Sequence, residues 1–389
     1  MIYFHWITGG LLAVIWLSRV IDAARGVRTL ADISQPEWNR NPVSATANPK
    51  VAIIVPARNE EGSIAQALRR LLALDYDNYQ VIAINDRSTD RTREIMDSVV
   101  SEAQGRLKIV HIRELAPGWM GKAHAMWTAA KHTDADWLLF TDADVMFRPD
   151  CLRRAIAYAE AERADHVVLL PRVIMKRPGE KMMVGFFQLL FVFGHRPWKC
   201  ADPKAKDHMG VGAFNLVRRT AYESIGTYER LRFEVVDDMK LGKIIKNAGF
   251  RQRVILGDNL IEIRWAHGAR GVVNNLTKNF FAVMSFQAWR AIGGSIVVAI
   301  LNLSPFFGVL FAPGWTRIAY GVALMSMFGL YAGIWRREDI PPWYFALHPI
   351  STVLFIYTIL RSMFVTLWNG GVEWRGTFYP LNELRKGLV

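Results

Sequence analysis

The chain has 389 residues, a formal net charge of +13 at pH 7 and a composition that is 51% hydrophobic. This charge would suit a nucleic-acid-binding protein, but the sequence has no basic run with interleaved aromatic residues, no zinc-ligand spacing and no recognition-helix pattern. We therefore expect no nucleic-acid partner, since attraction to the anionic headgroups of a lipid bilayer explains the charge better. The two cysteines, Cys151 and Cys200, give no sign of a disulfide framework, which fits a reducing compartment.

The hydrophobic residues are concentrated in long runs without Asp, Glu, Lys or Arg. A helix that spans a bilayer needs about 20 mostly apolar residues, so each run is a candidate for a transmembrane helix. The first run has no basic segment before it and no small-residue cleavage site after it. We therefore interpret residues 1–24 as a retained transmembrane anchor and expect a second membrane region at 291–368. The runs cover residues 1–18, 291–316, 318–335 and 340–360.

Basic residues that flank these runs predict their orientation. By the positive-inside rule, the flanks and the domain between them face the cytoplasm. Four spanning helices would place the polar tail, residues 369–389, on the opposite side of the membrane. If residues 343–368 instead form a re-entrant or interfacial element, the tail returns to the cytoplasm, and the sequence leaves both possibilities open. The flanking residues are Arg19, Arg25, Arg28, Lys278, Arg290, Arg336 and Arg337.

Between the membrane runs, strands alternate with helices. Residues 25–49 are polar and aperiodic, so we expect a linker there. The alternation that follows predicts an α/β domain over residues 50–265, with a mostly parallel sheet and right-handed crossovers. Its first strand is expected to stop at Pro56, which cannot donate a hydrogen bond to a neighbouring strand. The expected strands are 51–55, 80–84, 107–112, 137–140 and 167–170, and the expected helices are 64–72, 91–100 and about 149–163.

One segment inside this domain, residues 181–198, interrupts the soluble pattern. Between Met182 and Gly194 its only polar side chain is Gln188. The segment is too short to span a bilayer, so it is either a buried core helix or a helix lying in the membrane interface. We favour the interface because the domain is tethered to a membrane, and we expect a further interfacial segment at 266–290.

Four apolar segments of the domain end in acidic or polar residues. In an open α/β sheet the ligand crevice lies at the carboxyl ends of the strands, so these residues are expected to gather there. Two carboxylates that follow one buried strand suit a hard divalent cation such as Mg²⁺ or Mn²⁺. The four sets are Arg58, Asn59 and Glu60 after 51–57, Asn85 and Asp86 after 81–84, Asp142 and Asp144 after 137–140, and Asp237 and Asp238 after Val235 and Val236.

In type and order these motifs resemble those of the family 2 glycosyltransferases, over residues 50–265. The chain looks most similar to membrane-bound lipid glycosyltransferases, including ceramide glucosyltransferases and hopanoid-associated enzymes. The resemblance implies a Rossmann-like GT-A nucleotide-sugar-binding domain with transmembrane helices at both ends, in a bacterial inner membrane. It also implies an inverting, metal-assisted transfer of a sugar from a nucleotide-diphosphate sugar, such as a UDP-sugar, to a hydroxyl of a membrane lipid acceptor.

The sequence departs from the family pattern at two places. Asn85 replaces the first Asp of the second motif. The Gln/Arg-x-x-Arg-Trp box of processive relatives is present only as Arg264 and Trp265, because Ile261 stands where Gln or Arg belongs. We therefore expect a non-processive enzyme that transfers one sugar, or very few, per acceptor.

The resemblance implies a donor pocket at the first two strand ends. Backbone groups at the turn after Pro56 would meet the base, Glu60 would accept from ribose hydroxyls, and Asp86 would accept from an imide N–H. Glu60 could equally serve as an acid in the first turn of a helix, and Lys122 could be a solvated surface lysine rather than a contact to an anion. The expected donor-binding residues are Pro56, Ala57, Arg58, Glu60, Asp86, Lys122 and Asp142.

The remaining assignments concern the metal and the chemistry. A divalent cation is expected on Asp144, with Asp142 on the metal or the ribose, because a cation neutralises the charge that grows on the leaving diphosphate. Asp238 is the expected general base, since the adjacent Asp237 would raise its pKa, although Asp237 could instead cap the following helix. The residues expected on the acceptor side are Gly212, Arg264 and Trp265.

Two other functions are compatible with these motifs. A polyprenyl-phosphate hexose synthase would use an acceptor that is already an anion, so loss of Asp238 would matter much less. A catalytically inactive membrane component could retain the fold, but the intact Asp142, Asp144 and Asp238 argue against it. A sugar nucleotidyltransferase would need a Gly-rich phosphate loop near its start, which the sequence lacks.

Overall fold

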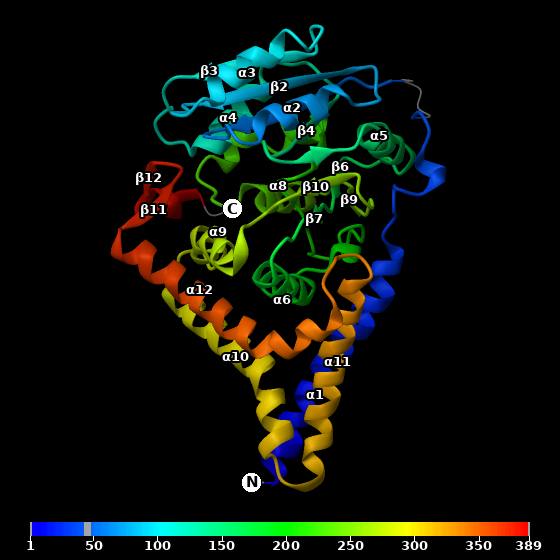
Figure 1. The fold of residues 1–389 in the computed structure, drawn as a ribbon, viewed down its shortest axis with the longest axis vertical. Coiled ribbons are helices and arrows are strands. Elements are labelled where there is room, and N and C mark those ends of the chain that lie inside the picture. The colour runs from blue at the N-terminus through cyan, green and yellow to red at the C-terminus, as the bar shows by residue number, and fades with distance from the viewer. Residues whose placement is uncertain (1, 43–47, 388–389) are drawn as a thin grey trace. The chain divides into compact units, whose positions relative to one another are not determined.

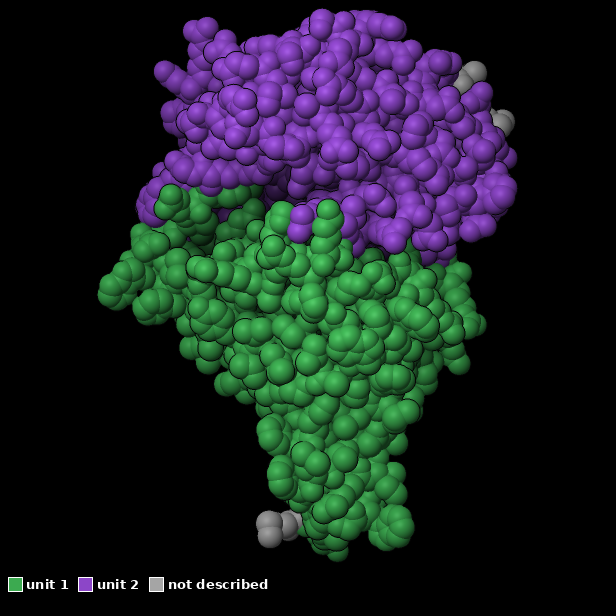
Figure 2. All heavy atoms as spheres, in the orientation of Figure 1, with its two compact units in different colours: residues 1–29, 175–196, 265–374 green, residues 30–174, 197–264, 375–389 purple. Residues whose placement is uncertain are grey.

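The structure is a computed structural model that describes residues 2–42 and 48–387, so residues 43–47 of the expected linker lie outside the described residues. The chain forms two compact units, coloured separately in Figure 2. Each unit is assembled from three separate stretches of sequence. Unit 1 consists of Met1–Thr29, Met175–Arg196 and Trp265–Trp374, and unit 2 of Leu30–Ile174, Pro197–Arg264 and Arg375–Val389.

Unit 2 is built on a seven-stranded sheet with the order β3-β2-β1-β4-β8-β6-β9. Neighbouring strands are parallel except where β8 pairs with β4 and β6, which confirms the mostly parallel sheet. A smaller sheet has the order β5-β10-β7. The strands are β1 (Val51–Ala57), β2 (Tyr79–Asp86), β3 (Leu107–Ile112), β4 (Trp137–Phe140), β5 (Met146–Phe147), β6 (His166–Leu169), β7 (Arg172–Val173), β8 (Asn215–Arg218), β9 (Gln252–Ile255) and β10 (Ile261–Ile263).

The central strands are buried on both faces. All five residues from Val51 to Val55 of β1 are fully buried, as expected for a parallel sheet covered on each side. The core joins the alternate residues Val51, Ile53 and Val55 to side chains of α2, α3 and α5, while α4 packs against β1 and β2. The helices of unit 2, labelled in part in Figure 1, are α2 (Ile64–Leu72), α3 (Thr92–Val100), α4 (Gly121–Ala130), α5 (Cys151–Ala161), α7 (Arg219–Ser224), α8 (Asp237–Asn247) and α13 (Leu381–Leu384).

The first strand continues through Pro56 to Ala57, so the expected stop at Pro56 is wrong. The pairing of β1 with β4 ends at Ile54, whereas its pairing with β2 continues to Ala57. A proline is tolerated there because one side of the strand no longer needs an N–H donor. The strand therefore carries its last residues beyond the edge of β4, next to the residues that follow β4.

Unit 1 contains the apolar helices predicted near both ends of the chain. Among the described residues, four helical segments are long and apolar enough to cross a membrane, by length and composition: Ile2–Thr29, Ala288–Phe311, Gly314–Trp335 and Pro342–Trp368. Its helices are α1 (Ile2–Gly26), α6 (Pro178–Gly194), α9 (Gly268–Val283), α10 (Ala288–Phe311), α11 (Arg317–Trp335) and α12 (His348–Trp368), followed by strand β11 (Gly371–Trp374).

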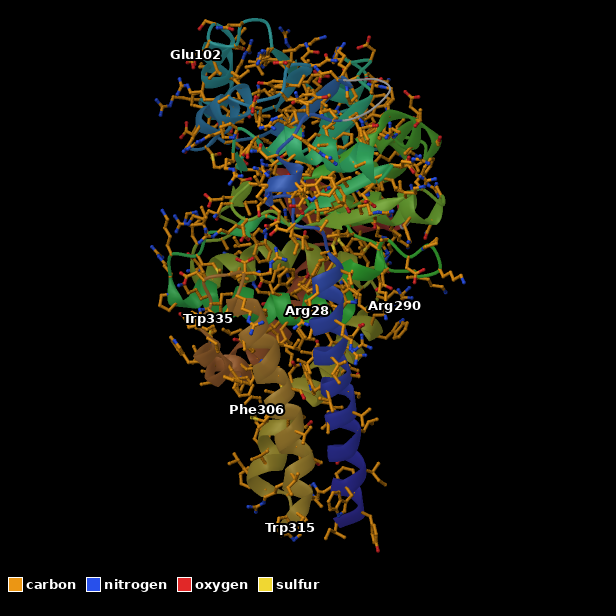
Figure 3. All side chains as sticks on the ribbon, turned by 90° about the vertical axis from the view of Figure 1, so that its right-hand side faces the viewer. Arg28, Glu102, Arg290, Phe306, Trp315 and Trp335 are labelled. Atoms are coloured by element: carbon orange, nitrogen blue, oxygen red, sulfur yellow. The ribbon has the colours of Figure 1, made fainter. Side chains whose placement is uncertain are left out.

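Helices α1, α10 and α11 lie side by side, and α12 runs across them rather than along them (Figure 1). Trp315 lies where α10 turns into α11, whereas Arg28 and Arg290 lie at the opposite ends of α1 and α10 (Figure 3). One end of this three-helix bundle is therefore basic, and the other carries an exposed tryptophan.

The apolar segment around Phe186 belongs to unit 1 rather than to the sheet-containing unit. Helix α6 packs against α9, α11 and α12. Phe186 is fully buried against the rings of His348 and Phe355, and Glu180 accepts a hydrogen bond from the backbone N–H of Gly268 at 2.7 Å. The expected interfacial segment at 266–290, which contains α9, lies in the same unit.

Candidate active site

The site lies at the carboxyl ends of three adjacent strands of unit 2. The order β2-β1-β4 brings together the strand ends that carry Asp86, Glu60 and Asp142. From β1 the chain passes to β2 on one side and later to β4 on the other, so β1 borders a topological switch point. Ligands of open α/β sheets bind in the crevice outside the strands at such a point.

At the end of β2, Asp86 is held by two arginines. Arg87 donates hydrogen bonds to both of its carboxylate oxygens, at 2.7 and 3.0 Å, and Arg58 Nη1 lies 3.8 Å from Oδ2. A Cβ atom at Gly121 would lie 2.5 Å from Asp86 Oδ2, so only glycine lets α4 begin this close to the carboxylate. The structure thus joins the predicted residues Arg58 and Asp86, with Arg87 as a partner that the sequence did not indicate.

Glu60 faces the C-terminal segment of the chain. Arg375 Nη2 donates to Glu60 Oε1 at 2.5 Å, and Arg375 Nη1 donates to the carbonyl of Arg58 at 2.6 Å. Tyr379, in strand β12 (Thr377–Pro380), accepts a hydrogen bond from the backbone N–H of Gly121 at 3.0 Å. Sequence reasoning missed these residues because nothing in the polar tail pairs locally with residues near position 60.

Lys122, in the first turn of α4, is not a solvated surface lysine. Its ammonium lies 2.7 Å from Asp142 Oδ1 and 3.8 Å from Asp237 Oδ1, and its side chain is 18% exposed. Burial alone would lower the pKa of Lys122, but the carboxylates of Asp142, Asp237 and then Asp238 raise it above its usual value. The lysine therefore remains charged and links the strand end of β4 to the start of α8.

Asp144 lies in a different environment from Asp142. Burial, followed by the charges of Asp142 and Glu60, raises the pKa of Asp144 to about 6, although the positive charge of Arg375 acts to lower it. A buried carboxylate among like charges is a good position for a cation. Within residues 2–42 and 48–387, no group of three or more His, Cys, Asp or Glu side chains could hold a metal ion. Asp144 and Asp142 alone fit a cation such as Mg²⁺, which commonly uses one or two carboxylates and completes its shell with substrate phosphates and water.

The two acidic residues of α8 are both fixed in place. Asp238 accepts hydrogen bonds from the backbone N–H groups of Gly212 at 2.8 Å and Met239 at 2.7 Å. Asp237 accepts one from the hydroxyl of Tyr228 at 3.2 Å. Val236, not Asp237, is the N-cap of α8, so the expected capping alternative for Asp237 is wrong.

Burial raises the pKa of both carboxylates above the usual range. For Asp238 the charge of Asp237 is the second cause, and for Asp237 the nearby Lys122 opposes the effect of burial. Tyr228, which donates to Asp237, was not singled out from the sequence because it lies in a short irregular helix, Tyr228–Leu231.

The residues expected on the acceptor side are only partly brought together. Gly212 is in the site, where its N–H contacts Asp238 and its carbonyl accepts from the N–H of Asp142 at 2.9 Å. Arg264 follows β10 in unit 2. Trp265 belongs to unit 1, where its ring packs against Phe187 with centroids 5.1 Å apart.

A mostly parallel α/β sheet with arginines, a lysine and carboxylates at its switch point is typical of an enzyme that binds an anionic nucleotide. Residues 52–226 match the family described as glycosyl transferase family 2. These features and the relatives described next identify the chain as a glycosyltransferase with the GT-A fold.

The relatives cover most of the chain. It is 22% identical over 340 residues to 4,4'-diaponeurosporenoate glycosyltransferase from Staphylococcus aureus (strain MRSA252), covering 86% of this chain and 89% of the relative. The protein of the same name from strain bovine RF122 / ET3-1 is 22% identical over 385 residues, with 95% and 99% coverage. A mannosyltransferase from Pyrobaculum calidifontis, solved in complex with GDP-Man and Mn²⁺, has a TM-score of 0.55 at 18% identity and covers 94% of this chain and 99% of its own.

Gly212→Ala tests the close packing of the site. A Cβ atom at Gly212 would lie 2.4 Å from Asp142 Oδ2, so the carboxylate must move and its contact with Lys122 is disturbed. We expect sugar transfer to fall about tenfold or more, with a loss of about 1–3 kcal/mol in the free energy of unfolding, as for other overpacked sites. Transfer rates and chemical denaturation check this.

The matched control is Gly62→Ala, because a Cβ atom there has no neighbour within 4 Å. Equal activity of both alanine variants and the native protein would contradict the assigned role of the contact between Gly212 and Asp142.

Proposed function

We propose that this glycosyltransferase is an inverting, non-processive enzyme that moves a sugar from a nucleotide-diphosphate sugar to a membrane lipid acceptor. The observation that carries the proposal is the set of charged contacts from Asp142 through Lys122 to Asp237, with Asp238 next to it in α8. This set lies beside the expected donor-binding residues at the strand ends. It contains a charged lysine that would bind a phosphate and a carboxylate whose raised pKa suits it to accept a proton.

The donor side is supported by the residues at the ends of β1 and β2. Glu60 would accept from ribose hydroxyls and Asp86 from the base, while Pro56 and Ala57 present backbone groups at the strand end. Lys122 and Arg58 supply positive charge for the diphosphate. The planar guanidinium of Arg58 is especially suited to donate hydrogen bonds to phosphate oxygens. A UDP-sugar is our proposed donor from the family resemblance, and the structural relative in complex with GDP-Man makes the guanine nucleotide the alternative to test.

Asp144, with Asp142 beside it, would hold the divalent cation. When bound, a cation of this kind neutralises the charge that develops on the leaving diphosphate. Burial and the charges of Asp142 and Glu60 raise the pKa of Asp144, so a cation held there would stabilise its ionised form. Lys122 would add a second positive charge, because its ammonium contacts the carboxylate of Asp142 directly.

Asp238 would act as the general base toward an acceptor hydroxyl. A carboxylate whose pKa is raised toward neutrality is a better proton acceptor than an exposed one, and it is still ionised at physiological pH. The N–H groups of Gly212 and Met239 hold both of its oxygens, so the carboxylate has a fixed orientation. Attack by the deprotonated hydroxyl on the anomeric carbon expels the nucleotide diphosphate and inverts the configuration.

The acceptor is proposed to be a lipid because the chain joins the catalytic unit to apolar helices. The Staphylococcus aureus relatives are named for 4,4'-diaponeurosporenoate, whose name denotes a carboxylate. An anionic acceptor of this type, or a polyprenyl phosphate, would not need a base. A hydroxyl acceptor is favoured here by the carboxylate of Asp238, which is partly buried, is oriented by two backbone N–H groups and has a raised pKa.

Asp238→Asn distinguishes the two classes of acceptor. Membranes containing the protein are incubated with labelled UDP- and GDP-sugars, and the labelled lipids are identified by mass spectrometry. For a hydroxyl acceptor, transfer should fall by about 10²–10⁴-fold, the usual contribution of a general base, while nucleotide binding is retained. In the native protein, activity should also fall as the pH drops through a value above the usual carboxylate range, because protonated Asp238 cannot accept a proton.

The control is Asp258→Asn, which changes an exposed carboxylate of the same unit. Nearly full transfer by Asp238→Asn would show an anionic acceptor, and absence of any labelled lipid with every donor would count against the proposed function. Long homopolymeric products would contradict the non-processive assignment.

Asp144→Asn tests the proposed metal ligand. We expect Mn²⁺ or Mg²⁺ to strengthen binding of the nucleoside diphosphate by about tenfold or more in the native protein, and EDTA to remove this effect. The variant should bind the nucleotide with little dependence on the cation, because one of two protein carboxylates is gone. Calorimetry with and without Mn²⁺ checks this, with Asp134→Asn as an isosteric control at an exposed carboxylate. Unchanged cation dependence in Asp144→Asn would remove Asp144 from the site.

We further propose that three of the four candidate helices cross the membrane. The chain leaves unit 2 after Arg264, passes through α10, α11 and α12, and returns to unit 2 at Arg375. Both ends of this excursion belong to one compact unit, so an even number of crossings lies between them. Because α10 and α11 run alongside α1, they are the pair that crosses, and α12 lies at the interface with α6 and α9 (Figure 1).

On this proposal the tail from Arg375 onward, which belongs to the catalytic unit, lies in the cytoplasm by the positive-inside rule. Arg28 and Arg290 then mark the cytoplasmic end of the bundle, and Trp315 marks the far end (Figure 3). Of the two topologies that the sequence left open, we propose the interfacial one.

Labelling of cysteine variants with a membrane-impermeant maleimide tests this orientation. Trp315→Cys should react in intact cells, whereas Phe378→Cys should react only after permeabilisation, because it belongs to unit 2. Both native side chains are exposed, at 77% and 52%, and both native cysteines are buried. Glu102→Cys serves as the marker for unit 2 (Figure 3). The proposal puts both Phe378 and Glu102 on the cytoplasmic side, because both belong to unit 2. Reaction of Phe378→Cys in intact cells in which Glu102→Cys does not react would contradict it.

A further inference from the structure

The C-terminal segment 375–380 lies on the donor pocket of its own unit. Arg375 contacts Glu60 and the carbonyl of Arg58. Thr377 Oγ1 accepts from Arg58 Nη1 at 3.2 Å and from Arg87 Nη1 at 3.4 Å. This segment therefore contacts residues from the ends of both β1 and β2, although it lies far outside the region that matches the glycosyl transferase family.

The segment has an anchored end and an accessible end. Tyr379 is 7% exposed and its hydroxyl accepts from the first N–H of α4, so this end is fixed against the pocket wall. The side chain of Arg375 is 43% exposed. Arg375 and Gly376 both have positive φ angles, 49° and 72°. A non-glycine residue in this conformation is disfavoured, which makes its position a candidate for a functional constraint.

Arg375 lies where an anionic group of the donor is expected. Within the described residues it forms an ion pair with Glu60, the residue expected to accept from the ribose, and its positive charge acts on the proposed metal ligand Asp144. Two other cations of the pocket also contact carboxylates of the site, Arg87 with Asp86 and Lys122 with Asp142. An arginine held between the ribose and metal residues is within reach of the diphosphate that joins these two sites.

We propose that Arg375 is a donor-binding residue that exchanges its contact with Glu60 for the diphosphate when the nucleotide-sugar binds. The inference rests on the proposed function and adds a contact from the C-terminal segment to it. The hydrogen bonds to Glu60 are replaced in this exchange, because ribose hydroxyls donate to the carboxylate in place of the guanidinium, while the positive charge of Arg375 moves to the diphosphate. The guanidinium then donates to phosphate oxygens, for which its planar geometry is well suited. Tyr379 and Thr377 are positioning residues that hold the segment while Arg375 moves.

The test measures binding of a nucleoside, its monophosphate and its diphosphate to the full-length protein in detergent by calorimetry. The uridine and guanosine series are both used, in the presence of Mn²⁺. For Arg375→Ala we expect the diphosphate to bind about 10- to 100-fold more weakly, the loss expected for one charge-assisted contact. Binding of the nucleoside should change by less than about twofold, since a phosphate contact does not act on it. Arg375→Lys should recover part of the loss.

The matched control is Arg69→Ala. Arg69, in α2, forms an exposed ion pair of the same kind with Glu102, which follows α3. Arg69 Nη2 lies 2.7 Å from Glu102 Oε1. Its loss should leave every affinity unchanged, and equal melting temperatures of the variants exclude a folding defect. Equal weakening of nucleoside and diphosphate by Arg375→Ala would show that the residue only shapes the pocket, and unchanged diphosphate binding would overturn the proposal. Failure of the native protein to bind either nucleoside diphosphate would instead refute the proposed function itself.

Discussion

The site depends on the positive charge of one largely buried lysine, Lys122. The ammonium of Lys122 lies between Asp142, which follows β4, and Asp237, which begins α8, so it joins two parts of the fold that would otherwise repel each other. Removing one member of a buried charged group leaves the others uncompensated, which costs more than the pair contributes. A lysine in the first turn of α4 is locally unfavourable for the helix dipole, and the neighbouring carboxylates offset this. The positive charge of Lys122 therefore offsets the mutual repulsion of Asp142, Asp237 and Asp238.

Close packing of backbone around these charges sets their geometry. A Cβ atom at Gly210 would lie 1.8 Å from the carbonyl oxygen of Asp238, and one at Gly242 would lie 1.9 Å from that of Met209. The start of α8 and the loop before β8 are thus in direct backbone contact. With Gly212 against Asp142, these glycines let a helix, a loop and a strand end meet at one point. The carboxylate orientations follow from this contact, because Asp238 takes its hydrogen bonds from backbone N–H groups rather than from mobile side chains.

The sheet and the polar residues at the ends of its strands were predictable because the relevant signals are local. Strands buried on both faces appear as continuous apolar runs, and the polar residues that end them, such as Asp86 and Asp142, follow directly in sequence. Contacts between distant segments were not predictable. Arg375 and Glu60 are 315 positions apart, and no sequence pattern in the tail indicates which residues it contacts. The prediction that the first strand ends at Pro56 was wrong for a related reason. Whether a strand needs a backbone N–H donor at a given residue depends on where the neighbouring strand ends, and the sequence does not show this.

The carboxylates of raised pKa lower the stability of the fold at neutral pH. Burial and neighbouring charges raise the pKa of Asp144 to about 6, so its ionised form at neutral pH is held against an unfavourable environment. For a carboxylate whose pKa is higher in the folded than in the unfolded protein, folding becomes more favourable as the pH falls through the raised value. Asp238, whose pKa is shifted in the same direction, adds to the effect. In the proposed mechanism a bound cation opposes this effect by stabilising the ionised carboxylates. Binding energy would then be used on Asp144, the proposed metal ligand, while the same environment raises the pKa of Asp238, the proposed base.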